Sequence, residues 1–214
     1  MIFLRKNILM STLNNLPNLT LSCGELALAM DKNIILTKKI IIEKVYALFS
    51  EMAIAANIVF APSLNSFEFI SKSIPKIYKG ENYKSFPYVL MDYPATFKKE
   101  NIFAVRTMFW WGNFISITLH ISGKYKTVFE KNILNANKND FFICVNENEW
   151  QHHFEDDNYK LLDALSAEEK DVVKEKTFIK IALKYELHHW NMMQYILPEG
   201  YKKLEKLLAS NSMK

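Results

Sequence analysis

The sequence has few of the residues from which common catalytic and cofactor sites are built. Its 214 residues include 5 glycines and 2 cysteines. Five glycines are too few for the glycine-rich loops that hold phosphates or dinucleotides, and no such motif occurs. The cysteines, Cys23 and Cys144, have neither a CxxC partner nor the spacing of a metal site. We therefore expect no nucleotide cofactor, no disulfide framework, and a reducing compartment such as the cytoplasm.

Arginine is nearly absent, although lysine is abundant. Only Arg5 and Arg106 are arginines, while lysine, asparagine and isoleucine are frequent, as is typical of an AT-rich genome. The planar arginine head donates several hydrogen bonds in a fixed geometry that lysine does not reproduce. This difference makes Arg106 a candidate for binding a small anionic ligand.

Neither sign of charge dominates the chain. Lysine and arginine total 27 against 23 for aspartate and glutamate, so the formal net charge is +4. Nucleic-acid-binding proteins usually gather their basic residues on one face. Here the lysines are scattered, and the densest group, Lys202, Lys203 and Lys206, has the spacing of an exposed helix face. The charge pattern argues against a nucleic-acid partner.

Long apolar runs are also missing. No stretch reaches the roughly 18 consecutive apolar residues of a membrane span. The first residues, Met1–Lys6, resemble the start of a signal sequence, but Asn14, Asn15 and Pro17 interrupt the apolar stretch and no cleavage site follows. We expect a soluble cytoplasmic protein that makes no membrane contact.

The beginning of the chain differs in composition from the rest. Residues 1–29 carry few charges and are rich in asparagine, serine, threonine and leucine, whereas Met30 opens a segment that looks like a natural start. We expect residues 1–29 to be a loosely attached extension or an alternative start region. The other interpretation is a first helix or strand packed on the domain. Residues 30–214 are expected to form a single domain.

Helical periodicity occurs before and after the middle of the chain. Residues 38–59 carry two apolar stripes at three- and four-residue spacing, which predicts a central helix with a wide buried face. Ser166 and Glu169 form a capping box that opens another helix. Residues 189–197 are predicted to be helical, and Pro198 is predicted to start a last helix. Its expected apolar stripe is Tyr201, Leu204, Leu207 and Leu208.

Strand patterns fill the middle of the chain, at residues 86–94, 102–111, 114–121 and 141–145. Gly112 and Asn113 predict a two-residue hairpin turn, because both residues tolerate positive φ. Residues 178–185 fit a buried helix as well as a strand. The order of helices, antiparallel strands and helices predicts an α+β domain in which the helices pack on one face of the sheet.

A two-residue turn would fix the two faces of the hairpin. It pairs Trp111 with Phe114 and places Arg106 on an otherwise apolar face that packs against the helices. A buried guanidinium needs a partner. Asp92 in the neighbouring strand is the internal candidate, and a carboxylate or phosphate of a ligand is the alternative. The opposite face would carry Val105, Thr107, Phe109, Trp111, Phe114, Ser116, Thr118 and His120.

Polar groups among aromatic rings are typical of small-molecule pockets, so this second face is a candidate binding surface. The alternative is an ordinary half-exposed sheet face with cross-strand threonine and aromatic pairs. The candidate ligand-binding residues are Asp92, Arg106, Thr107, Trp111, Ser116, Thr118 and His120.

The histidines do not have the spacing of a metal site. His152-His153 and His188-His189 are adjacent pairs, whose side chains point in different directions on a regular element. Neither HExxH nor a nucleophile motif such as GxSxG occurs. Residues 152–157 have suitable ligand types but are predicted to form a loop. We expect no metal, and the sequence identifies no catalytic residue.

Three functions remain open at this stage. The first is a non-enzymatic domain that binds a small ligand or a protein partner through the sheet. The second is an enzyme that acts on a small anionic substrate with Arg106, Asp92 and His120. The third is a dimerisation module that uses the aromatic hairpin tip, Phe109–Trp111, because tryptophan is enriched in interfaces.

Overall fold

The computed structural model describes residues 19–135 and 140–209. Contacts between Cα atoms divide the chain into two units, Met1–Ile41 and Ile42–Lys214. The first unit holds α2 (Cys23–Met30), which opens with a capping box between Ser22 and Glu25 and buries none of its residues. Residues 1–18 of the predicted extension lie outside the described residues. The predicted boundary at residue 30 therefore stays a prediction.

Helix α3 (Lys32–Leu64) begins in the first unit and continues into the second, where it ends at Leu64. By length and composition alone, α3 is apolar enough to cross a membrane. A count of only the uninterrupted apolar residues in the sequence does not detect this. A helix in the core of a soluble protein can have the same length and composition. In α3, 39% of the most apolar window is buried. Its buried side chains belong to the second unit and include Val45, Phe49, Met52, Ala53, Ala56, Phe60 and Leu64.

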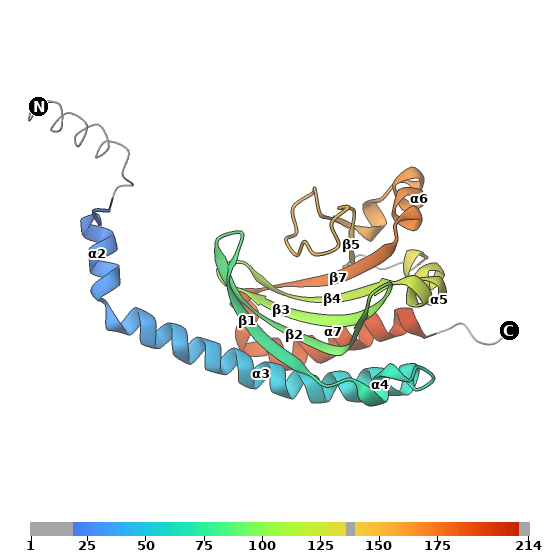
Figure 1. The fold of residues 1–214 in the computed structure, drawn as a ribbon, viewed down its shortest axis with the longest axis horizontal. Helices are drawn as coiled ribbons and strands as arrows, with labels where there is room; N and C mark the ends of the chain where they lie inside the picture. The colour runs from blue at the N-terminus through green and yellow to red at the C-terminus, as the bar shows by residue number, and fades with distance from the viewer. Residues whose placement is uncertain (1–18, 136–139, 210–214) are drawn as a thin grey trace, which may run out of the picture. The chain divides into compact units, whose positions relative to one another are not determined.

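The second unit is built on an antiparallel sheet, as the sequence predicts. Seven strands are found among the described residues, in the order β1-β2-β3-β4-β7-β5-β6 (Figure 1). The ambiguous segment 178–185 is a strand. The strands are β1 (Lys76–Tyr83), β2 (Phe86–Lys98), β3 (Asn101–Trp110), β4 (Phe114–Ser122), β5 (Phe142–Cys144), β6 (Tyr159–Leu161) and β7 (Phe178–Glu186).

Helices precede and follow these strands, which confirms the predicted α+β class. Helices α3 and α7 (Met193–Leu208) lie against the same face of the sheet (Figure 1). The remaining helices are α4 (Phe69–Lys72), α5 (Gly123–Leu134), η1 (Leu162–Ala164), α6 (Ala167–Glu175) and η2 (Leu187–Met192). Helix α5 was not predicted.

Packing of α7 on the sheet is close. All four residues of its predicted apolar stripe, Tyr201, Leu204, Leu207 and Leu208, are buried. A Cβ atom at Gly200 would collide with the Tyr185 hydroxyl and lie 2.7 Å from Ile117 Cδ1, so a larger residue would have to displace these side-chain ends. The prediction that Pro198 starts the helix is wrong. The helix begins at Met193 and continues through the proline, because Met193 and Leu197 on its N-terminal side are buried in the same core.

The hairpin is present, but its predicted register is wrong by one residue. Trp110 pairs with Phe114, so the loop has three residues rather than two. Gly112 adopts a φ of 68°, and the Asn113 N–H donates to the Trp110 carbonyl at 3.1 Å. A shift of one residue reverses the faces of β3 relative to β4, and the β3 side chains, Arg106 among them, lie on the opposite face from the one predicted. The helix-facing side therefore carries Val105, Thr107, Phe109, Ile115, Ile117, Leu119 and Ile121, and the other side carries Arg106, Phe114, Ser116, Thr118 and His120.

Candidate functional site

Arg106 and Asp92 form a buried ion pair at the centre of the sheet. They lie directly opposite each other on β3 and β2. Arg106 Nε donates to Asp92 Oδ1 at 2.7 Å, and Arg106 Nη2 donates to Asp92 Oδ2 at 2.8 Å. The side chains are 12% and 4% exposed. This two-point contact is the internal pairing considered for Arg106, and it occupies both oxygens of the carboxylate.

Two further side chains complete the surroundings of Arg106. Tyr78 donates its hydroxyl hydrogen to Asp92 Oδ2 at 2.9 Å and accepts from Arg106 Nη2 at 3.1 Å. His152 Nε2 lies 3.2 Å from Arg106 Nη1. Burial disfavours the guanidinium charge, but the hydrogen bonds and charge of Asp92 outweigh it and raise the pKa of Arg106. Arg106 is therefore held as a cation by groups of its own chain.

His120 lies on the same face and is bound to an acidic residue. Its Nε2 is 2.9 Å from Glu149 Oε2. Burial, together with the charges of Lys180 and Arg106, lowers the pKa of His120 to about 3. The imidazole is thus neutral at pH 7 and donates its Nε2 hydrogen to the carboxylate. With Nε2 as the donor, Nδ1 is the unprotonated nitrogen of His120, and it belongs to a side chain that is 7% exposed.

Lys180, on β7, was not identified from the sequence. Its ammonium group donates to the backbone carbonyls of Glu149, at 2.8 Å, and of Gln151. Burial lowers the pKa of Lys180 to about 8. An isolated lysine within the apolar run of residues 178–183 is the signal that reveals it, because a charge in a buried strand needs a dedicated partner.

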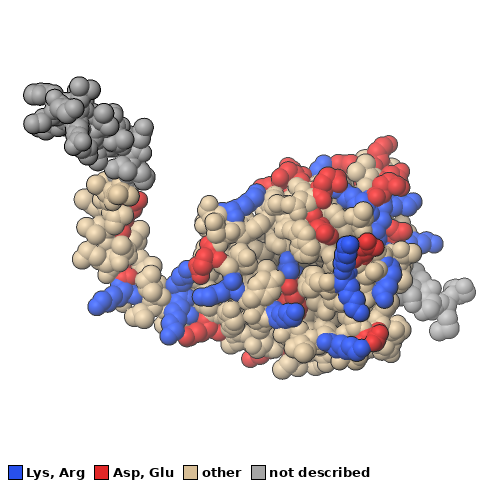
Figure 2. All heavy atoms as spheres, in the orientation of Figure 1, with Lys and Arg blue, Asp and Glu red and all other residues tan. Residues whose placement is uncertain are grey.

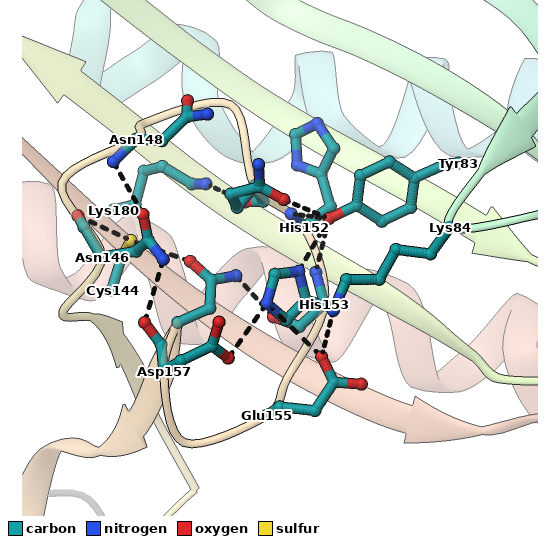
Figure 3. A network of polar contacts seen from close by, with 12 residues as sticks. Tyr83, Lys84, Cys144, Asn146, Asn148, His152, His153, Glu155, Asp157 and Lys180 are labelled. Atoms are coloured by element: carbon teal, nitrogen blue, oxygen red, sulfur yellow. Dashed lines mark hydrogen bonds and ion pairs between the residues drawn. The ribbon is translucent and has the colours of Figure 1, made fainter.

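The partners of His120 and Lys180, and His152 beside Arg106, come from one loop, Val145–Asn158, which we call the covering loop (Figure 3). Its ends are joined, because the Val145 N–H donates to the Asn158 carbonyl at 2.8 Å. Near one end, Lys176 donates to the carbonyls of Val145 and Asn146 at 2.8 and 2.9 Å. Such closed loops are held by their own side chains and often carry function.

Aromatic packing fixes the covering loop on the sheet. The Phe154 ring stacks on Tyr159 with 4.5 Å between centroids and meets the Phe114 ring edge-on at 5.0 Å. The Tyr83 hydroxyl accepts the backbone N–H groups of His152 and His153 at 2.6 and 3.1 Å. Both faces of the sheet are thus covered, one by helices and the other by this loop.

His153, Glu155 and Asp157 bring three ligand-type atoms within 4.8 Å of one another. The Tyr83 oxygen accepts two backbone hydrogens, and its own hydrogen is within reach of Gln151 Oε1 at 3.2 Å and of His153 Nδ1, the nearer acceptor, at 2.9 Å. With Nδ1 accepting, His153 Nε2 carries the ring hydrogen and donates to Asp157 Oδ1 at 3.1 Å. A metal ligand needs an unprotonated nitrogen. The arrangement therefore fits an internal hydrogen-bond network better than a cation.

The structure divides the seven candidate residues between the two faces. Asp92, Arg106, Ser116, Thr118 and His120 share the loop-covered face and are largely buried. Thr107 lies on the helix-facing side, where its hydroxyl is 2.7 Å from the Tyr201 hydroxyl. Trp111 lies in the hairpin loop and packs edge-on against Phe109 at 5.6 Å. The candidates do not form one pocket.

Three hollows lie elsewhere on the second unit. The first, which we call the apolar groove, has a volume of about 510 Å³ and is lined by Ser50, Ala53, Ile54, Asn57, Pro75, Ile77 and Tyr93. The second, which we call the lysine hollow, has a volume of about 150 Å³ and is lined by Glu68, Phe69, Lys72, Ala95, Thr96, Lys98, Lys124 and Tyr125. The third lies between α5 and α6 and has a volume of about 430 Å³.

Comparison of the chain with protein-family models, with curated proteins and with solved structures finds no match.

Proposed function

We propose that the protein is a non-enzymatic binding domain and that the apolar groove is its binding surface. The chemically reactive side chains support this proposal, because they are bound to other side chains of the same chain. Arg106 and Asp92 bind each other, and His120 is neutral and bound to Glu149. An enzyme that acts on an anionic substrate would need these side chains open to it, whereas those of Arg106, Asp92 and His120 are 12%, 4% and 7% exposed. We therefore favour the binding function over catalysis.

The observation that carries the proposal is the concentration of exposed isoleucine around the apolar groove. Ile54 lines the groove and is 65% exposed. Ile58 follows one helical turn later at 69%, and Ile74 precedes the lining residue Pro75 at 74%. Contiguous exposed apolar surface of this kind marks interaction sites. A concave groove beside it suits an extended apolar group.

Two other surfaces of the second unit give less support for binding. At the hairpin tip, Phe109 and Trp110 are 4% and 3% exposed, so they offer little to a second copy of the chain. On the face shown in Figure 2, basic and acidic residues are interspersed over the sheet-containing unit. This mixed charge gives no continuous track for nucleic acid. We propose a cytoplasmic location, which suits the exposed thiol of Cys23 and the buried thiol of Cys144.

The test uses the neutral fluorescent probe N-phenyl-1-naphthylamine, which brightens in apolar sites. We expect saturable binding to the wild-type protein and binding at least about fivefold weaker for Ile54→Lys, since one lost apolar contact of about 1 kcal/mol has that effect. Val172→Lys is the matched control, because Val172 is 60% exposed on α6. Equal binding by wild type and Ile54→Lys, with both folded by circular dichroism, would refute the groove as the binding surface.

A further inference from the structure

The lysine hollow gathers positive charge in a small space. Lys72, Lys98 and Lys124 line it together with one carboxylate, Glu68, so its charged lining sums to 3 − 1 = +2. The Thr96 hydroxyl also lines it. A hollow of about 150 Å³ with this lining suits a small anionic group such as a carboxylate or phosphate.

Glu68 does not neutralise this charge. It pairs with Lys72, one turn away on the same short helix. Neither Lys98 nor Lys124 forms an ion pair within the part of the chain that the structure describes, and the Lys124 ammonium lies 5.1 Å from the centroid of the Tyr125 ring. The hydrogen bond from Lys72 and the charges of Lys72, Lys98 and Lys124 lower the pKa of Glu68. Two cations thus remain available to a ligand.

The lysine hollow and the apolar groove open on either side of one short connection. Lys72 lines the first and Pro75 the second. Between them, Ser73 is anchored to Ala95, whose N–H it accepts at 2.9 Å. Ala95 lines the lysine hollow, and Tyr93, two residues earlier on β2, lines the apolar groove. Two residues of chain span at most about 7 Å, so one molecule of modest length reaches both.

We propose that the apolar groove and the lysine hollow together form a site for a single anionic amphiphile, with the alkyl chain in the groove and the carboxylate or phosphate head among Lys72, Lys98 and Lys124. This inference rests on the proposed function and assigns its ligand class. The exposed Ile74 lies on the path between the hollows and covers the first carbons of the chain. Two recessed hollows suit one molecule, whereas a bilayer presents a broad surface.

The experiment compares decanoate with decanol, which share a chain and differ in head charge, as competitors of N-phenyl-1-naphthylamine at pH 8. We expect decanoate to compete about tenfold more strongly than decanol, because two exposed lysines of about 0.7 kcal/mol each give that ratio. The preference should disappear in the double variant Lys98→Gln, Lys124→Gln. It should persist in Lys131→Gln, Lys174→Gln, which removes two lysines from the hollow between α5 and α6.

Each remaining outcome is informative. Equal competition by decanoate and decanol would overturn the head assignment and leave the proposed function standing. A preference that survives in the Lys98→Gln, Lys124→Gln variant would place the head elsewhere and overturn it too. Displacement of the probe by inorganic phosphate alone would show that the ligand needs no alkyl chain, and it would overturn the amphiphile. Sedimentation with phosphatidylglycerol vesicles, without competition by decanoate, would replace the single amphiphile by a membrane. Failure of the probe itself to bind would remove the groove and the inference together.

Discussion

At the scale of single residues, several charged side chains lie on the sheet, and groups of the same chain provide their hydrogen-bond partners. Arg106 is bound by Asp92, Tyr78 and His152, and Lys180 is bound by two backbone carbonyls. A buried charge is costly unless such partners are in place. The stability of the fold therefore depends on both members of each pair.

Removing one member of the central pair tests this dependence. We expect Arg106→Met to lower the free energy of unfolding by about 3 kcal/mol, because it leaves the Asp92 carboxylate buried without its cation. Adding Asp92→Leu should recover part of the loss. Urea unfolding of both variants measures the effect. Lys84→Met is the control, since its pair with Glu155 is exposed and should contribute less than about 1 kcal/mol. A loss for Arg106→Met no larger than that of the control would contradict the prediction.

His120 makes stability sensitive to acid. Burial lowers its pKa from 6.5 to about 3, so between these values the unfolded chain binds a proton that the folded chain does not. Stability is then fully present above pH 6.5 and falls as the pH decreases, by at most about 1.4 kcal/mol for each unit. We expect His120→Gln to make the dependence of unfolding free energy on pH between 6 and 4 less steep, with the remainder due to His152, whose pKa burial also lowers. An unchanged slope would show that the folded protein accommodates the protonated ring.

At the scale of elements, the covering loop is fixed by side chains rather than by a ladder of backbone hydrogen bonds. It has no regular secondary structure between β5 and β6, and side chains of Lys176, Lys180 and Tyr83 supply its partners. Segments fixed in this way open more readily than strands or helices. The sheet face beneath the loop is consequently protected by side chains from distant parts of the chain.

Hydrogen exchange followed by mass spectrometry tests this role. In Lys180→Met the carbonyls of Glu149 and Gln151 lose their donor. We expect amides of the covering loop to exchange about tenfold faster, which corresponds to roughly 1.4 kcal/mol, with α3 and α7 unchanged. Lys160→Met is the control, since Lys160 pairs with Glu169 outside the loop. Faster exchange throughout the sheet would mean instead that Lys180 supports the whole fold.

At the scale of the whole molecule, the buried lysine gives the unfolding free energy a dependence on alkaline pH. Burial lowers the pKa of Lys180 from 10.5 to about 8, so between these values the unfolded chain holds a proton that the folded chain has released. This contribution makes stability rise with pH through that window. Cys144, beside it, acts in the opposite direction because burial raises its pKa. The tyrosines also oppose it above pH 10, since burial raises the pKa of Tyr78 to about 12.

The difference between wild type and Lys180→Met isolates the lysine contribution. We expect the wild type to gain stability relative to the variant as the pH rises from 8 to 10, by at most about 3 kcal/mol. Thermal unfolding at several pH values measures the gain. A constant difference across this range would show that Lys180 keeps its proton in the folded protein.

The sequence alone predicts much of the architecture. Apolar and aromatic runs bounded by turn residues locate β2, β3, β4 and β5, and three- and four-residue spacing locates most of α3 and the buried stripe of α7. These patterns are readable because they reflect which residues are buried. Strand β1 was not predicted. It lies at the edge of the sheet and none of its residues is buried, so it lacks an apolar pattern. Helix α5 escaped because Gly123-Lys124 has the form of a strand-ending turn.

The candidate site was predictable only as a set of residue types. The chain itself determined that Arg106 is exceptional and that Asp92 is its nearest partner, because both lie in adjacent strands of a readable pattern. Only the tertiary structure decided the faces, since a three-residue loop instead of a two-residue loop moves Ser116, Thr118 and His120 beside Arg106. It also decided the contacts of Lys180 and Tyr83 with the covering loop. Those contacts join residues about 30 and 70 positions apart, and local periodicity carries no information about pairing over such separations.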